Sequence, residues 1–173
     1  MTAPVTSSSP APAQMAAASP LFLREAEVRR GIEMLYFGYS ALTRSIDERL
    51  ATLGLGRAHH RALYFISRQP DLSVGDLLRL LAITKQSLGR VLTDLSERGY
   101  VQARPGVRDR RQKLLRLTAE GAALEAECFR ALREKMGAAY AQAGQGSVTG
   151  FWRVLDGLIP EQDRSMVMGL QGG

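Results

Sequence analysis

The sequence predicts a mainly α-helical protein with a small β-hairpin, in the α+β class. Three observations lead to this prediction. Two short segments in the middle of the chain repeat apolar residues at positions i, i+3, i+4 and i+7, the period of an amphipathic helix. Two alternating segments follow directly, as the strands of a hairpin would. Longer helical patterns precede and follow this centre, so we expect long helices at both ends of the chain.

The chain of 173 residues fits one domain with an appended arm. Residues 1–20 are rich in Ala, Ser and Pro without periodicity, which predicts a disordered tail. Cys128 is the single cysteine, so an internal disulfide is excluded and a reducing cytoplasm is the expected location. No apolar run is long enough to span a bilayer, and no secretory signal pattern is present, so we expect no membrane partner.

A long helix is predicted from about Leu21 to Leu53, because apolar residues recur there at alternating threes and fours. This stripe consists of Ile32, Leu35, Tyr39, Leu42, Ile46, Leu50 and Leu53. It can pack inside one chain or against a second subunit, and over this length a subunit contact is at least as well supported. Gly54 and Gly56 end the helix.

Two short helices in the centre form a predicted helix-turn-helix. A helix over about Ala58 to Arg68 comes before them. Ser73 starts the first of the pair, with Asp76 where a capping box usually has Glu or Gln. Thr84 caps the second, and Gly99 ends it. Their inward faces are expected to be Val74, Leu77, Leu78 and Leu81, then Leu88, Val91, Leu92 and Leu95.

A β-hairpin is predicted next, from strands at Tyr100–Arg104 and Lys113–Thr118. A hairpin directly after a helix-turn-helix makes a winged helix-turn-helix. Helices are then expected over about 119–143 and up to Pro160, with a loose end at 161–173. The predicted organisation is a tail over 1–20, a dimerisation helix over 21–56, the winged helix over 57–118 and C-terminal dimerisation helices over 119–173.

The basic charge of the chain is confined to its middle third. The net charge is +6, yet residues 57–118 alone carry thirteen basic and five acidic residues. The flanking segments are neutral or acidic. A solubilising surface would spread its charge along the chain, whereas a concentrated basic patch is typical of a polyanion partner. A polyanion is therefore the expected partner, and beside a helix-turn-helix we expect it to be double-stranded DNA.

The second helix of the pair presents residue types that contact phosphates and base edges in a major groove. With its apolar face inward, its outward side carries Thr84, Lys85, Gln86, Ser87 and Arg90. Gly89, within this helix, either allows close approach to DNA or is simply tolerated. Ser73 either reaches a phosphate or only caps its helix, and one serine can do both.

The hairpin tip clusters cations around one carboxylate. Arg108, Arg110, Arg111 and Lys113 repel one another unless a polyanion neutralises them, and arginine suits a narrow minor groove. Asp109 is two residues from Arg111, a spacing at which a carboxylate can brace a guanidinium. The alternative is a solvated loop with an incidental acid, but beside a helix-turn-helix we favour DNA binding.

From about residue 25 to 160 the chain resembles the MarR (multiple antibiotic resistance regulator) family. The resemblance rests on the segment LSVGDLLRLLAITKQSLGRVLTDLSERGYV, on the D-x-R pattern of Asp109–Arg111, and on L-T-x-x-G at Leu117–Gly121. It implies a winged-helix homodimer whose first and last helices interlock. Two recognition helices would enter successive major grooves of a pseudo-palindrome. The wings would lie in the flanking minor grooves, with Arg111 as the minor-groove residue.

Other functions have weaker support in the sequence. No dinucleotide fingerprint, P-loop or catalytic triad pattern is present, so we expect no enzyme, and no cofactor or metal is expected. His59 and His60 are either ordinary structural histidines or contacts for a small-molecule effector, haem or a metal. Cys128 lies near Glu125 and Glu127, which argues against a reactive thiol. A winged helix that binds proteins instead of DNA is the main alternative to a repressor.

Overall fold

The computed structural model describes residues 20–106 and 109–171. The expected disordered tail therefore lies outside the described residues, except for Pro20. The chain divides into two compact units, residues 1–39 and 40–173, and each is described by itself. The first unit holds a short 3-10 helix, Pro20–Leu23, and the beginning of helix α1, Glu25–Thr52. Within the described ranges, no helix is both long enough and apolar enough to cross a membrane.

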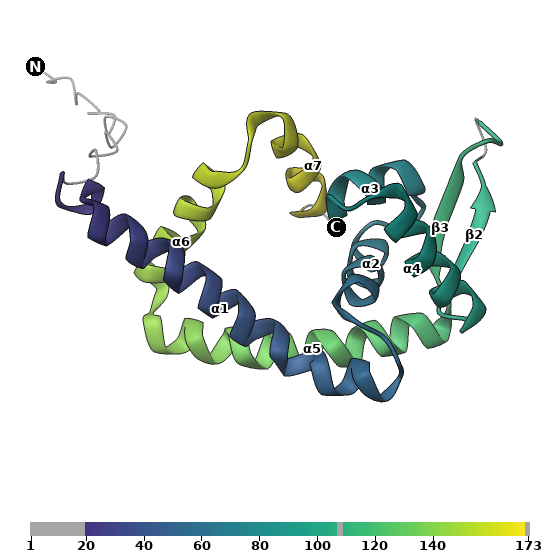
Figure 1. The fold of residues 1–173 in the computed structure, drawn as a ribbon, viewed down its shortest axis with the longest axis horizontal. Coiled ribbons are helices and arrows are strands. Elements are labelled where there is room, and N and C mark those ends of the chain that lie inside the picture. Colours follow the sequence, from purple (N-terminus) through teal and green to yellow (C-terminus); the bar gives the residue numbers. More distant parts are fainter. Residues whose placement is uncertain (1–19, 107–108, 172–173) are drawn as a thin grey trace, which may run out of the picture. The chain divides into compact units, whose positions relative to one another are not determined.

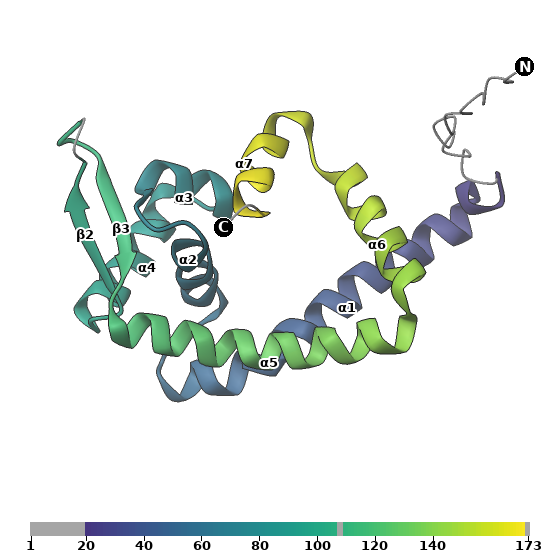
Figure 2. The ribbon, with the colours of Figure 1, turned by 180° about the vertical axis from the view of Figure 1, so that it is seen from behind.

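The second unit contains the end of α1 and all later elements (Figure 1). In chain order they are α2 Arg57–Arg68, β1 Leu72–Ser73, α3 Val74–Leu81, α4 Lys85–Glu97, β2 Val101–Pro105, β3 Lys113–Leu117, α5 Ala119–Ala143, α6 Gln145–Leu158 and α7 Glu161–Gln171. The predicted α+β class is confirmed, and so are the helix-turn-helix α3–α4 and the hairpin β2–β3. The view from behind shows α5 leaving the base of this hairpin (Figure 2).

The core of the second unit is built from the predicted apolar faces. In α3, Leu77 and Leu81 are buried, and in α4 the buried residues are Leu88, Val91 and Leu95. The positions expected beside them, Val74, Leu78 and Leu92, pack against this core while remaining partly exposed. The helical period of the sequence therefore identifies the face that each short helix buries.

The apolar stripe of α1 has two different environments. Ile46 and Leu50 are each 1% exposed and belong to the core of the second unit. Ile32 and Leu35, in the first unit, are 64% and 44% exposed. The sequence left two alternatives for this stripe, packing inside one chain and packing against a second subunit. Each of them now applies to a different half of the helix. The C-terminal half is intramolecular core, and the N-terminal half is an apolar surface.

The sheet has a third strand that the sequence did not predict. The two-residue strand β1 pairs antiparallel with β3, and the strand order is β1-β3-β2. Leu72 lies opposite Leu115, and both residues are 2% exposed. Two residues are too few to show the alternation by which strands are recognised in a sequence. This short strand joins the hairpin to the start of α3.

The L-T-x-x-G segment closes the junction between the hairpin and α5. Thr118 Oγ1 accepts a hydrogen bond from the Gly121 N–H at 3.0 Å and donates one to the Gly99 carbonyl at 2.6 Å. A Cβ on Gly121 would meet the Tyr100 carbonyl oxygen well inside 3.0 Å and would lie 2.9 Å from its carbonyl carbon. The hydroxyl of Thr118 therefore caps α5, and glycine is needed at position 121 because the backbone there lies against the backbone of Tyr100.

The expectation of a loose end at residues 161–173 is wrong, because α7 covers Glu161–Gln171. Glu161 and Asp163 lie in its first turn, where negative charge stabilises a helix. Arg68 Nη2 of α2 donates to the Leu170 carbonyl at 2.7 Å, which attaches the end of α7 to α2.

Candidate nucleic-acid interface

The helix-turn-helix is held at its first helix by a local cap. Ser73 Oγ accepts a hydrogen bond from the Asp76 N–H at 3.1 Å and donates to Asp76 Oδ2 at 2.6 Å. The hydroxyl of Ser73, followed by Arg79, lowers the pKa of Asp76. The predicted cap is therefore present, although Asp76 accepts from the side chain of Ser73 where a capping box uses the backbone. Contact of Ser73 with a phosphate stays a prediction.

The start of α4 presents the predicted polar face to solvent. Thr84 caps the helix by accepting from the Ser87 N–H at 3.1 Å, and its hydroxyl donates to Ser87 Oγ at 2.9 Å. The five side chains Thr84, Lys85, Gln86, Ser87 and Arg90 are all exposed. A capped helix start also directs unpaired backbone N–H groups outward, which favours a phosphate. This face can contact both a DNA backbone and base edges.

The rear of α4 is fixed to the segment that follows α1. Arg98 Nη1, just after α4, donates to the Leu53 carbonyl at 2.5 Å. His59 Nε2 lies 3.2 Å from Asp94 Oδ2, while His59 Nδ1 accepts from the Gly56 N–H at 3.1 Å. Because Nδ1 accepts, the Nε2–H must be the donor to Asp94. Both nitrogens of His59 therefore have structural partners.

Gly89 lies on the exposed face of α4, three residues after Gln86. A Cβ built on it meets nothing within 4 Å. We expect Gly89→Ala to raise the free energy of unfolding by about 0.5–1 kcal/mol, because alanine loses less backbone entropy in a helix. Thermal or urea unfolding measures this.

The same variant tests why glycine stands at this position. If DNA approaches the helix closely at Gly89, the added methyl group must weaken binding although the protein is more stable, and this is the result we expect. A variant that is stabilised and binds DNA as tightly as the wild type would mean that the glycine is only tolerated.

Backbone hydrogen bonds connect the described residues of the wing tip. Gly106 N–H donates to the Gln112 carbonyl at 2.9 Å, and Gln112 N–H donates to the Asp109 carbonyl at 3.1 Å. A Cβ on Gly106 would lie 2.6 Å from the Asp109 carbonyl oxygen, so glycine is required for this closure. Arg110, Arg111 and Lys113 are exposed on the turn and its second strand. Arg108, also predicted for this site, lies outside the described residues.

The contact between Asp109 and Arg111 differs from the predicted one. Asp109 Oδ1 accepts a hydrogen bond from the backbone N–H of Arg111 at 2.9 Å, whereas the sequence suggested a contact with its guanidinium. An Asp side chain bonding the backbone two residues on is a common turn device. Asp109 therefore fixes the backbone from which the Arg111 side chain extends.

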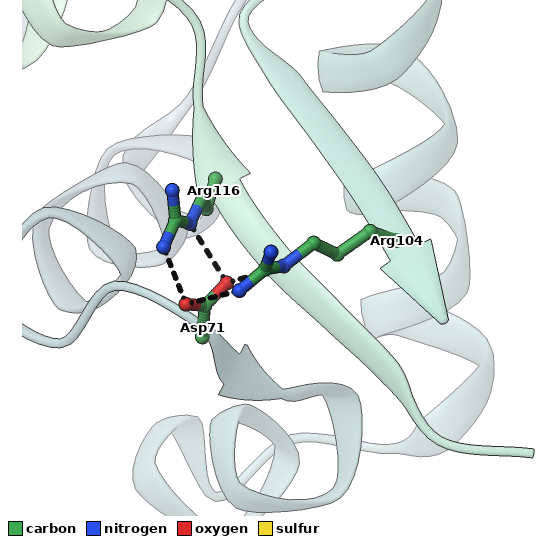
Figure 3. Close-up of polar contacts among 3 residues, drawn as sticks. All are labelled: Asp71, Arg104 and Arg116. Atoms are coloured by element: carbon green, nitrogen blue, oxygen red, sulfur yellow. Dashed lines mark hydrogen bonds and ion pairs between the residues drawn. The ribbon is translucent and has the colours of Figure 1, made fainter. Parts of the chain in front are cut away.

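Asp71, beside the strands of the wing, is an important residue that was not predicted. Its carboxylate accepts paired hydrogen bonds from Arg104 of β2 and from Arg116 of β3 (Figure 3). Hydrogen bonds from Arg116 and then Arg104 lower its pKa from 3.8 to about 2. The turn residues Pro70 and Asp71 mark a loop in the sequence, but they do not indicate which distant arginines this carboxylate meets.

His60 and Cys128 are both buried. His60 is 7% exposed, and burial lowers its pKa. Cys128 is 1% exposed, and burial, followed by Glu127 and Glu125, raises the pKa of its thiol. A raised thiol pKa reduces the reactive thiolate form, which agrees with the expectation that Cys128 is not a reactive thiol. Contact of His59 or His60 with an effector stays a prediction.

No cluster of three or more His, Cys, Asp or Glu residues that could hold a metal ion occurs among residues 20–106 and 109–171.

Comparison with known proteins identifies the family. The model of the MarR family matches residues 53–112, which span the helix-turn-helix and the first strand of the wing. The HTH-type transcriptional regulator PetP of Rhodobacter capsulatus is 46% identical over 139 residues, covering 80% of this chain and 84% of PetP. The chain belongs to the MarR family. It is thus a MarR-family helix-turn-helix transcriptional regulator, and that family is not a class of enzymes.

Solved structures of MarR proteins share this fold. A mutant MarR from E. coli complexed with operator DNA has a TM-score of 0.63 at 22% identity, covering 82% of this chain and 100% of its own. A MarR family protein from Mycobacterium tuberculosis in complex with p-aminosalicylic acid has a TM-score of 0.54 at 27% identity, covering 73% and 95%. These similarities confirm the winged helix-turn-helix that the sequence predicted.

Proposed function

We propose that this MarR-family regulator binds a pseudo-palindromic operator as a homodimer and represses the genes under its control until a small-molecule effector releases it. One observation carries the proposal. A single compact unit combines the exposed, capped start of α4, with its amide, hydroxyl and cationic side chains, and a basic wing tip. A protein-docking surface would not need both of these features.

Each part of this surface suits a different groove. The exposed face of α4 has the size and chemistry for a major groove, where Lys85 and Arg90 can bind guanine or phosphate and Gln86 can bind adenine. The wing tip suits the flanking minor groove, where Arg111 would lie in the focused negative potential. Phosphate contacts from Ser73, Arg108, Arg110 and Lys113 would fix the position of the protein on the duplex.

A homodimer is supported by apolar surface outside the DNA-binding elements. In the first unit, Ile32, Met34 and Phe37 of α1 are between 64% and 68% exposed. In the second unit, Trp152 and Val154 of α6 are 55% and 65% exposed. Large apolar side chains exposed to this extent favour a role for these helices as interaction surfaces. A two-fold dimer would place the recognition helices one DNA turn apart, about 34 Å.

An effector has a candidate site between α2 and α5. A cavity of about 400 Å³ is lined by residues that include Tyr64, Phe129, Arg133 and Tyr140. Aromatic walls and one guanidinium suit a flat, negatively charged molecule. His59 and His60 are not among the residues that line this cavity. Because DNA is the proposed partner, the cytoplasm remains the expected location.

The decisive experiment selects binding sites from random duplex DNA with the full-length protein and, in parallel, with Arg111→Ala. We expect the wild type to enrich a pseudo-palindrome with half-sites about 10 bp apart. The variant should bind this site more weakly, by about 1–3 kcal/mol for each Arg111 side chain that is removed from a groove.

Failure of the wild type to enrich any sequence would overturn the proposal and favour a protein partner on the same basic face. A pseudo-palindrome bound equally well by Arg111→Ala would retain operator binding but reject the minor-groove role of Arg111.

A further inference from the structure

Asp71 connects the wing to the helix-turn-helix through two arginines. Arg104 Nε and Nη2 donate to its two carboxylate oxygens at 2.9 and 2.7 Å, and Arg116 does the same at 2.8 and 2.6 Å (Figure 3). Arg104 belongs to β2 and Arg116 to β3, so one carboxylate holds both strands of the hairpin. Paired hydrogen bonds of this kind fix orientation as well as distance.

The backbone of Asp71 is itself fixed. Its N–H donates to the Leu115 carbonyl at 3.0 Å, and its φ of +67° lies in the left-handed region, which few residues other than glycine, Asn and Asp adopt readily. The next two residues form β1, and Ser73 then caps α3. Asp71 is therefore attached to the helix-turn-helix along the chain and to the wing through its side chain.

The two arginines depend on this carboxylate. Gln102 lies opposite Arg116 and Arg104 opposite Leu114, so Arg104 and Arg116 are diagonal neighbours on one face of the hairpin. Two like charges at such positions repel each other unless an anion lies between them. With its pKa lowered to about 2, Asp71 stays ionised throughout the neutral and mildly acidic range. Its stabilising effect is lost only as the pH falls from about 4 toward 2.

We propose that Asp71 is a positioning residue for DNA binding, because it sets the angle of the wing relative to α3 and α4. This inference rests on the proposed function, in which the wing tip enters a minor groove. The hairpin strands are five residues long, so the tip lies about 17 Å from their base. A tilt of about 10° at the base would move the tip by about 3 Å, which is half the width of the minor groove, about 6 Å.

The test compares Asp71→Asn with the wild type on the selected DNA site. Asparagine tolerates the left-handed backbone but cannot pair ionically with two arginines. Asp47→Asn is the matched control, since Asp47 makes the same paired contact with Arg57, at 2.9 and 2.6 Å, away from the wing. Hydroxyl-radical footprinting reports minor-groove protection, methylation protection reports the major groove, and amide hydrogen exchange reports the wing without DNA.

Positioning predicts three results for Asp71→Asn. Wing amides exchange faster, protection of the flanking minor grooves is lost while major-groove protection remains, and affinity falls at least about five-fold. If Asp71 acted only through its charge, Asp71→Asn would raise the DNA affinity instead. Removing a negative charge near DNA tightens binding and steepens its salt dependence. Asp47→Asn should behave like the wild type in every measurement.

The proposal is overturned if Asp71→Asn keeps the wild-type footprint, if it binds more tightly, or if its wing amides exchange at the wild-type rate. Each of these outcomes leaves operator binding intact, because the wild type still selects its site. If the wild type selects no site, the proposed function fails, and the role of Asp71 in DNA binding fails with it.

Discussion

Substitution of Gly121 by alanine is expected to cost the protein at least about 3 kcal/mol of its free energy of unfolding. The added Cβ would penetrate the Tyr100 carbonyl group, and both partners are backbone atoms. The backbone at Gly121 and the Tyr100 carbonyl group cannot change rotamer as a flexible side chain can. The helix α5 must therefore move away from the start of β2. Overpacking of this kind costs about 1–3 kcal/mol and more when backbone must shift. Urea unfolding measures the decrease in stability.

Gly137→Ala is the control for this prediction, because Gly137 lies in the same helix and a Cβ there meets nothing within 4 Å. It should be neutral or stabilising by up to about 1 kcal/mol. Equal stability of the two variants would show that the junction between α5 and the hairpin accommodates a side chain at position 121. That result would contradict the prediction, which rests on the close approach of Gly121 to Tyr100.

DNA affinity is expected to fall by a factor of about 10³–10⁵ when the salt concentration is raised from 50 to 200 mM. Each chain brings five described cations to the proposed DNA-binding surface: Lys85, Arg90, Arg110, Arg111 and Lys113. If six to ten phosphates are neutralised by a dimer, log K falls by about 0.9 per phosphate for each ten-fold increase in salt. Fluorescence anisotropy with the selected operator at several salt concentrations gives this slope.

Lys113→Ala tests how many subunits bind the DNA, because the change that it causes in the salt slope scales with the number of bound subunits. In a homodimer two phosphates are no longer neutralised, so the slope should decrease by about 1.8, whereas for a bound monomer it should decrease by about 0.9. Lys135→Ala, an exposed lysine in the second half of α5, should leave the slope unchanged. A decrease with Lys135→Ala as large as with Lys113→Ala would contradict the assignment of the wing as the DNA-binding surface.

The predictable part of the fold is the part encoded in local patterns. The spacing of Leu77, Leu81, Leu88 and Leu95 identified two short helices and their buried faces. The strand β1 was missed because its two residues are ordered by pairing with β3, more than 40 positions along the chain. The helix α7 was missed because its short sequence gives a weak pattern and Arg68 of α2 holds its end.

The same distinction applies to the candidate site. The exposure of residues such as Gln86 and Arg90 was predicted because they lie on the side of α4 opposite its buried apolar face. The partners of Asp71 were not, because Arg104 and Arg116 are 33 and 45 positions away and only the fold brings them together. At Asp109 the sequence indicated the right pair of residues, but the bond joins its carboxylate to the backbone of Arg111.

The attachment of α4 at its rear makes this helix a lever. Asp94 and Arg98 are held by His59 and by the Leu53 carbonyl, whereas the polar side chains at the other end of α4 are exposed to solvent. Thirteen residues make a rod about 20 Å long. A rotation of about 5° about the held end would therefore move the start of the helix by about 2 Å, enough to break a hydrogen bond to a base. Small rotations of α4 about this held end would thus adjust the fit to DNA without altering any side chain that contacts it.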